Sequence, residues 1–181
     1  ADHRIAVGGD VLEFRTLPCA GLVDATDYGV SLASADNAAA FAAAIAAVPA
    51  GGTLTLPPGR YVSGPIFLKS DMTLYLPEGA QIAAPGDRAG WPILPERDDA
   101  GRVIGTWEGL PAACFAAPVT AVGCDRLTIT GRGVIDGGGD RGDWWTWPKE
   151  RREGAYRPRT LFLAHCRDVV LSGVTVRNSP S

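Results

Sequence analysis

The segment Thr53-Leu-Thr-Leu-Pro-Pro-Gly-Arg-Tyr-Val62 is echoed by Thr73-Leu-Tyr-Leu-Pro-Glu-Gly-Ala-Gln-Ile82, about 20 residues further along the chain. A fixed period of this size is typical of solenoids, in which each coil is one structural unit. A second repeat relates Asp125-Arg-Leu-Thr-Ile-Thr-Gly131 to Arg167-Asp-Val-Val-Leu-Ser-Gly173, and both also match Ser70–Leu76. Each copy is a short polar turn followed by a strand with apolar residues at alternate positions.

A coil with this pattern cannot bury its own apolar face. It gains a core only by stacking on its neighbours at a strand spacing of ~4.8 Å. The first coil of such a stack would expose unpaired backbone groups and an open core. The sequence therefore predicts an all-β solenoid, a parallel β-helix, with a cover over its first coil.

One helix is predicted, at residues 37–48. Asp36 is the expected N-cap, and Pro49 with Gly51-Gly52 ends the helix. Phe41, Ile45 and Val48 form a single apolar stripe on an otherwise alanine-rich surface. We expect this helix to be the N-terminal capping α-helix of the solenoid.

The chain divides into two regions. In residues 1–22, two short apolar stretches flank Gly8-Gly9-Asp10 and predict a hairpin. This hairpin is either an edge of the main fold or the remnant of a preceding β-module, because Asp10–Thr16 resembles the closing strand of a fibronectin-type-III-like module. Residues 23–181 are the expected N-terminal coils of the β-helix domain, incomplete at the C-terminus.

Composition excludes several classes of function. The net charge is −3, and no basic cluster extends beyond Lys149–Arg152, which argues against a nucleic-acid partner. No apolar run approaches the ~18 residues that a membrane-spanning helix needs, so no membrane partner is expected. The cysteines show no Cys-x-x-Cys metal spacing, and we expect neither a metal nor a cofactor. Cys124 and Cys166 share one position of the repeat and would stack in neighbouring coils, as buried thiols or as a disulfide.

Two stretches, residues 84–117 and 137–158, interrupt the repeat. Long loops are where solenoids place their binding chemistry. The candidate substrate-binding residues all lie in the second stretch: Arg157, Trp144, Trp145 and Trp147. Arginine suits a carboxylate ligand because it binds in a bidentate manner. Tryptophan rings stack on sugars, although packing beneath a long loop is the alternative role for all three. Asp136, before three glycines, is expected to close an Asx-type turn.

Further motifs resemble a known family. Asp27-Tyr28-Gly29, the Gly51–Gly59 segment, Gly131-Arg-Gly-Val-Ile-Asp-Gly137, Trp144-Trp145 and Val174–Pro180 resemble glycoside hydrolase family 28, the polygalacturonase family, and its exo-acting bacterial members in particular. The resemblance implies a right-handed parallel β-helix that hydrolyses α-1,4-galacturonosyl linkages in pectin by an inverting route. It also implies a secreted or periplasmic protein with a galacturonan substrate.

The family carries its chemistry in an Asn-Thr-Asp motif, an Asp-Asp pair, a Gly-His-Gly segment and an Arg-Ile-Lys segment, which follow the Asn-Ser-Pro stretch. Here that stretch is Asn178-Ser179-Pro180, and the family motifs are not found in the chain. We therefore assign no catalytic residue, expect the chain alone to be inactive, and expect the remaining C-terminal coils of the same protein to be its partner. The alternatives are a Ca²⁺-dependent pectate lyase-like enzyme, with Asp140 and Asp143 near the metal, and a non-catalytic β-helix carbohydrate-binding or adhesin module.

Overall fold

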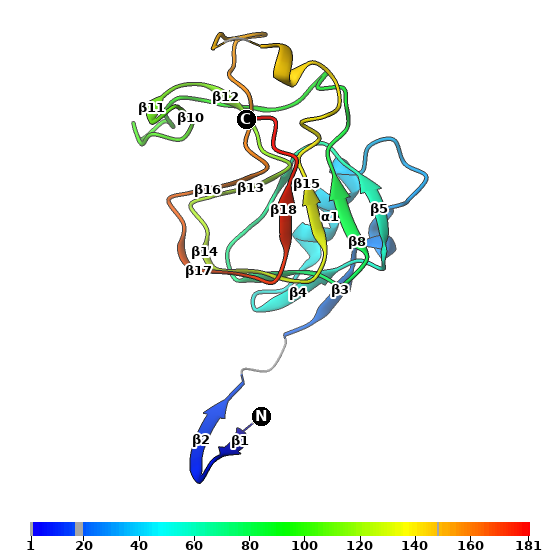
Figure 1. Ribbon diagram of the computed structural model, residues 1–181, viewed down its shortest axis with the longest axis vertical. Helices are drawn as coiled ribbons and strands as arrows, with labels where there is room; N and C mark the ends of the chain where they lie inside the picture. The colour runs from blue at the N-terminus through cyan, green and yellow to red at the C-terminus, as the bar shows by residue number, and fades with distance from the viewer. Residues whose placement is uncertain (1, 17–19, 148) are drawn as a thin grey trace.

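The main body of the chain is three parallel β-sheets, and the three complete coils pass through all of them in turn (Figure 1). The computed structural model describes residues 2–16, 20–147 and 149–181. Sheet one holds β3 (Leu22–Asp24), β4 (Gly52–Thr55), β7 (Met72–Leu76), β14 (Asp125–Gly131) and β17 (Arg167–Ser172). Sheet two holds β5 (Gly59–Val62), β8 (Ala80–Ala83), β15 (Val134–Asp136) and β18 (Thr175–Arg177). Sheet three holds β6 (Ile66–Phe67), β13 (Val119–Val122) and β16 (Leu161–Ala164).

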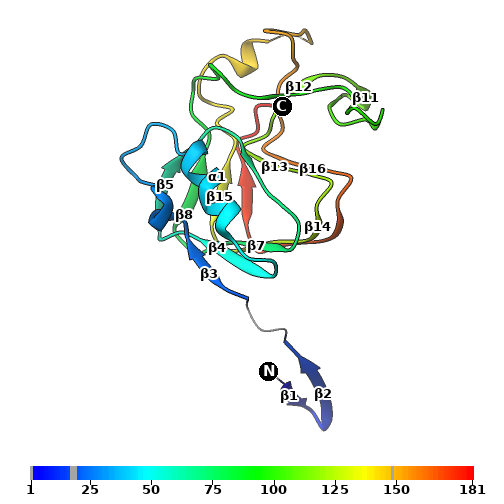
Figure 2. The ribbon, with the colours of Figure 1, turned by 180° about the vertical axis from the view of Figure 1, so that it is seen from behind.

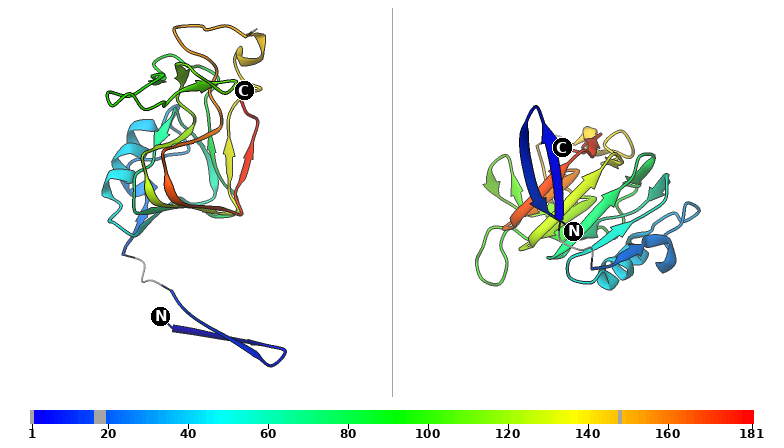
Figure 3. Two further views of the ribbon diagram at one scale, coloured as in Figure 1. Left: turned by 90° about the vertical axis from the view of Figure 1, so that its left-hand side faces the viewer. Right: turned by 90° about the horizontal axis from the view of Figure 1, so that it is seen from below.

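Rows of buried side chains, each lying on its counterpart in the next coil, fill the interior of the stack. Leu54, Leu74 and Ile129 pair in successive strands of sheet one, and each is 0% exposed. Met72 and Leu127 form a second buried ladder beside them. The strands follow one another side by side in chain order (Figure 3, right). The predicted parallel β-helix is confirmed.

The repeat alignment is wrong by one residue in sheet two. It places Val62 beside Ile82, whereas the structure pairs Tyr61 with Ile82 and Val62 with Ala83. Three residues separate Thr55 from Gly59, whereas four separate their partners Tyr75 and Ala80, so one extra residue in the turn after β7 shifts the strand that follows. Because strand side chains alternate between faces, only the shifted pairing buries both Tyr61 and Ile82.

The predicted capping helix forms as α1 (Ala38–Ala47) and lies over the first coil (Figure 2). Its apolar stripe is confirmed, because Phe41, Ile45 and Val48 are all buried in the main core. The helix contacts both β3 and β6, at the first coil of sheets one and three. It therefore covers the end of the core that the strands leave open.

The start of α1 differs from the prediction. Asn37, not Asp36, is the N-cap residue, and its buried side chain bonds to the backbone of Ser31 and Val62 instead of to the helix. Asp36 still satisfies a free N–H of the first turn, since its Oδ1 accepts from Ala38 N at 2.9 Å. The same oxygen accepts from Gly64 N at 2.8 Å, so one carboxylate ties the helix to the coil beneath it.

The turn that leads into sheet one carries alternating charges along the stack. Asp71, Arg126 and Asp168 occupy equivalent positions, and all three have φ between 53° and 59°. Arg126 Nη2 donates to Asp71 Oδ2 at 2.8 Å, and Arg167 Nε donates to Asp125 Oδ1 at 3.1 Å in the next pair of coils. A slip of one residue would place Asp71 beside Asp125, so like charges oppose the wrong register.

The cysteines of the described residues are free thiols. Cys124 and Cys166 immediately precede the paired residues Asp125 and Arg167, as the repeat predicted, and Cys124 Sγ donates to Leu68 O at 3.3 Å. Burial raises the pKa of the Cys124 thiol, and the neighbouring Cys166 adds to this effect. Cys114 is buried in the first inserted stretch. Cys19 lies outside the described residues.

The predicted N-terminal hairpin forms from β1 (Asp2–Val7) and β2 (Asp10–Arg15). Every residue of both strands is exposed, and the hairpin stands apart from the coils (Figure 1). Part of the predicted 1–22 region, residues 1 and 17–19, lies outside the described residues. Leu22 already belongs to β3, so sheet one begins one residue before the predicted boundary.

None of the helices in the described residues has the length and apolar character of a membrane span.

The core ladders predict a large cost for cavities in the stack. Replacing Leu74 by alanine should lower the free energy of unfolding by about 3 kcal/mol, because the neighbouring coils hold the cavity open. Urea unfolding followed by circular dichroism measures this loss. The matched control is Leu110→Ala, since Leu110 is 70% exposed and should change stability by less than about 0.5 kcal/mol. Equal losses in the two variants would contradict the ladder as the source of stability.

Candidate functional site

Two insertions leave the solenoid at the same corner, between sheets two and three. The first insertion, residues 84–118, follows β8, and the second, residues 137–160, follows β15. The first contains the short strands β9 (Ile93–Leu94), β10 (Thr106–Trp107), β11 (Leu110–Pro111) and β12 (Cys114–Phe115). The second contains the short 3-10 helix η2 (Trp144–Thr146). Both lie above the strands in Figure 3, left.

The two insertions are joined through their backbones. Tyr156 N–H donates to Ala113 O at 2.9 Å, and Phe115 N–H donates to Tyr156 O at 2.9 Å. The first insertion also folds over the outer face of sheet three, where Ile104 and Cys114 pack with Phe162 of β16. The insertions therefore form one structure on the corner of the solenoid.

Beneath their surface lies a buried aromatic cluster. Trp144 and Trp147 are 1% and 4% exposed, and their ring centroids lie 5.3 Å apart. Phe115 contacts both rings, and Trp91 contacts Trp144. This burial corrects the prediction for Trp144 and Trp147, because neither ring has a face available to a sugar. Their role in this structure is the alternative one, packing beneath the insertions.

The insertions also carry a stack of aromatic and guanidinium groups, which is exposed at Trp145 and buried at Trp107. Trp145 is 63% exposed, and the Arg157 guanidinium lies 4.7 Å from its ring centroid and 5.3 Å from that of Trp107. Trp107 in turn stacks on Tyr156 with centroids 4.9 Å apart and planes 6° from parallel. The Arg151 guanidinium covers Tyr156 at 5.4 Å. We call these five residues, together with Arg159 over the Trp107 ring, the arginine–aromatic stack.

The charges of this region are not neutralised by acidic side chains. Within the described residues, Arg151, Arg157 and Arg159 have no carboxylate within ion-pair distance, whereas most other basic side chains do. Arg159 also lies over the Trp107 ring, at 5.7 Å. Arg157 donates from Nη1 to Trp144 O at 3.3 Å and makes no other hydrogen bond within the described part of the chain. Its Nε is buried without a partner, so the remaining Nη donors are the ones that suit an anionic ligand.

Of the four predicted substrate-binding residues, the structure brings Arg157 and Trp145 together on the surface. The prediction did not include Trp107, Tyr156, Arg151 or Arg159 among the site residues. The sequence holds a partial signal, since Tyr156 and Arg159 flank Arg157 in a basic and aromatic segment. Nothing in the sequence indicates that Trp107, in the other insertion, stacks against them.

Asp136 closes the start of the second insertion, in the predicted Asx-type turn. Its carboxylate is 5% exposed and accepts five hydrogen bonds, from the Gly138 N–H and from the side chains of Gln81, Arg141, Arg177 and Asn178. Burial raises the pKa of Asp136, but these donors outweigh it and hold the pKa below its ordinary value. Asp136 is thus a structural anion.

The described residues contain no group of three or more His, Cys, Asp or Glu placed to hold a metal, at Asp140 and Asp143 or elsewhere.

No family model matches the chain. Comparisons with individual proteins find relatives that are named as galacturonan-degrading enzymes. The chain is 29% identical to a probable polygalacturonase of Vitis vinifera over 184 residues, which cover 95% of this chain and 35% of the relative. It is 31% identical to an exo-poly-alpha-D-galacturonosidase of Dickeya chrysanthemi over 145 residues, which cover 77% of this chain and 23% of the relative. A family 28 exopolygalacturonase structure from Yersinia enterocolitica matches with a TM-score of 0.73 at 21% identity, over 94% of this chain and 37% of that chain.

These comparisons confirm two parts of the sequence prediction. The structural likeness establishes the fold as the right-handed parallel β-helix. The sequence relatives confirm the resemblance to polygalacturonases of glycoside hydrolase family 28. The chain spans 35% and 23% of the length of the two relatives, so the resemblance concerns part of such a protein.

Asp136 predicts an acid-sensitive second insertion. The pKa of Asp136 is lowered in the folded state. The carboxylate therefore stabilises the fold at a pH above the ordinary carboxyl pKa near 4, and this stabilisation is lost as the pH falls through the folded-state pKa. Asp136→Asn should cost about 2 kcal/mol at pH 7, since two arginines lose their anionic partner. Urea unfolding at pH 7 and pH 3 measures the difference, which should shrink at pH 3. The control is Asp99→Asn at an exposed loop position; a cost independent of pH would contradict the assignment.

Proposed function

We propose that this chain is part of a pectin-degrading glycoside hydrolase of the polygalacturonase type, and that it binds galacturonate carboxylates at the arginine–aromatic stack. The parent protein would hydrolyse α-1,4-galacturonosyl linkages with inversion. The observation that carries the proposal is that Arg151, Arg157 and Arg159 lie on aromatic rings with no acidic partner in the described residues. The relatives named polygalacturonase and exo-galacturonosidase support the same substrate.

The stack suits an anionic sugar for two physical reasons. A guanidinium offers paired N–H groups that match a carboxylate, and such charge-assisted bonds are roughly twice as strong as neutral ones. The exposed ring of Trp145 offers an apolar face to the C–H groups of a sugar ring. A neutral polysaccharide would use the ring but leave three cations unpaired, so a polyuronate is the better ligand.

Hydrolysis itself requires groups that we do not assign to this chain. Inversion needs an acid and a base on carboxyls roughly 6.5–9.5 Å apart. The buried carboxylate of Asp136 already accepts five hydrogen bonds, and these donors hold its pKa low. It is therefore a poor general acid. We therefore propose that the chain alone is inactive and that the catalytic pair lies on further coils of the same protein.

The last coil offers a surface for such coils. Leu163, Leu171 and Val176 continue the buried ladders of the three sheets, yet they are 36%, 49% and 41% exposed. Stacked coils would return these side chains to the core and pair the free edges of β16, β17 and β18. Because pectin is a polymer outside the cell, we also propose that the protein is secreted or periplasmic.

Galacturonate binding should depend on Arg157. Replacing it by methionine removes the guanidinium but keeps an apolar chain between Trp107 and Trp145. We expect the dissociation constant for trigalacturonate to rise about tenfold or more, the scale of one charge-assisted bond. Isothermal titration calorimetry at low salt measures it. Arg97→Met, an exposed arginine of the first insertion away from the stack, is the matched control. Equal binding by both variants would sink the proposed site.

Binding should not require calcium. The stack presents cations and no metal-ligating cluster is found among the described residues, so EDTA should leave the affinity for trigalacturonate unchanged. The same titration with excess EDTA tests this against a lyase-type site. A loss of binding that added Ca²⁺ restores would favour the Ca²⁺-dependent lyase instead.

A further inference from the structure

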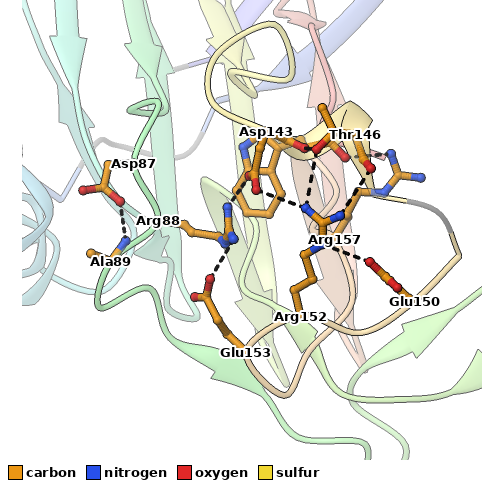
Figure 4. A network of polar contacts seen from close by, with 10 residues as sticks. Asp87, Arg88, Ala89, Asp143, Thr146, Glu150, Arg152, Glu153 and Arg157 are labelled. Atoms are coloured by element: carbon orange, nitrogen blue, oxygen red, sulfur yellow. Dashed lines mark hydrogen bonds and ion pairs between the residues drawn. The ribbon is translucent and has the colours of Figure 1, made fainter.

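Arg88 of the first insertion reaches into the second insertion. Its guanidinium donates to Asp143 Oδ1, and to Glu153 Oε1 at 2.7 Å (Figure 4). It also lies 5.3 Å from the Trp144 ring centroid and 4.8 Å from that of Trp147. The side chain is only 16% exposed, so this cation is largely removed from water. One side chain therefore contacts two carboxylates and two indole rings of the other insertion.

A second arginine, Arg152 of the second insertion, contacts the same carboxylate and one of the same rings. Arg152 donates to the other oxygen of Asp143 at 3.2 Å and lies 5.3 Å from the Trp147 ring centroid. It also donates to Thr146 O at 3.3 Å, and Asp143 O accepts from Thr146 N and Oγ1. Asp143 thus bridges two guanidiniums, and helix η2 is held at both of its ends.

Helix η2 also carries the exposed half of the candidate site. Trp144 O is the acceptor that fixes Arg157 Nη1, and the next residue, Trp145, stacks on the same guanidinium. Trp144 and Trp145 therefore have opposite orientations on one short helix: the first is locked beneath Arg88, the second faces solvent. A helix of three residues has too few internal hydrogen bonds to hold this geometry alone.

We propose that Arg88 is a positioning residue for galacturonate binding: by clamping Asp143 and the Trp144 and Trp147 rings, it fixes η2 so that Trp145 and Arg157 present one ligand surface. This inference rests on the proposed function of the arginine–aromatic stack. Arg88 lies outside the stack and acts on the ligand through η2. The first insertion thereby controls the geometry of residues that belong to the second.

The experiment uses tryptophan accessibility as a readout that needs no ligand. Trp145 is the exposed ring, while Trp91, Trp107, Trp144 and Trp147 are each 9% exposed or less. In a Trp145→Phe background, acrylamide should quench the intact protein weakly. Adding Arg88→Met should raise the quenched fraction at least twofold, because Trp144 and Trp147 lose their cover. Arg88→Lys, which keeps the charge but not the fork, should fall between the two.

The second arm measures affinity for trigalacturonate with Trp145 in place. Arg88→Met should raise the dissociation constant about tenfold, and Arg88→Lys should recover part of the loss. Arg97→Met, in the same insertion, should change neither readout. If Arg88→Met fails to fold, Arg88→Lys and Asp143→Asn carry both arms, since each keeps the size of the side chain.

The outcomes separate the clamp from the proposed function. Unchanged quenching in the Arg88 variants overturns the clamp, and so does increased quenching with unchanged affinity. Increased quenching together with weakened binding supports the proposal. If the unmodified chain does not bind trigalacturonate at all while quenching still responds to Arg88, the proposed function fails and the positioning of η2 by Arg88 stands.

Discussion

The structure depends on one constraint: a single coil cannot bury its own apolar residues, so every coil must meet its neighbours in register. Leu54, Leu74 and Ile129 are completely buried only because each lies on the next in the same orientation. The charge alternation at Asp71 and Arg126 acts on the same register from the outside. The first coil lacks a preceding neighbour, and α1 supplies the missing cover with Phe41 and Ile45. Packing against neighbours, instead of local propensity, thus sets both the strands and their cap.

Stacking in register also explains why residues far apart in the chain form one site. Equivalent corners of successive coils lie above one another, so insertions after β8 and β15 emerge side by side. Trp107 and Arg157 belong to different coils and still share a stack. The insertions stay together through strand-like bonds at Tyr156, through the buried aromatic cluster and through the Arg88 contacts.

The sequence predicts the elements that repeats, turns and caps specify, and it misses contacts between distant segments. The parallel β-helix, the capping helix, the hairpin and the stacking of Cys124 on Cys166 all follow from repeats or spacing. The register of β5 does not, because one extra residue in the turn after β7 leaves the repeat readable while reversing the face of each side chain. The candidate site is only partly predictable. Three nearby tryptophans look alike in sequence, and the partner that decides their burial, Arg88, lies 55 residues before Asp143. Likewise, an arginine without a carboxylate partner is recognised only when its spatial neighbours are known.

The contact made by Asp36 has a consequence for how the protein is made. Its carboxylate joins the start of α1 to Gly64, and Asn37 joins it to Val62, so the helix is anchored by residues that precede both insertions. Everything needed to close that end of the core is therefore translated before either insertion leaves the ribosome. The cap and first coil can form a template on which later coils are added one by one during synthesis. In this order, the segments richest in tryptophan and arginine emerge onto an existing surface, which limits their exposure to wrong partners.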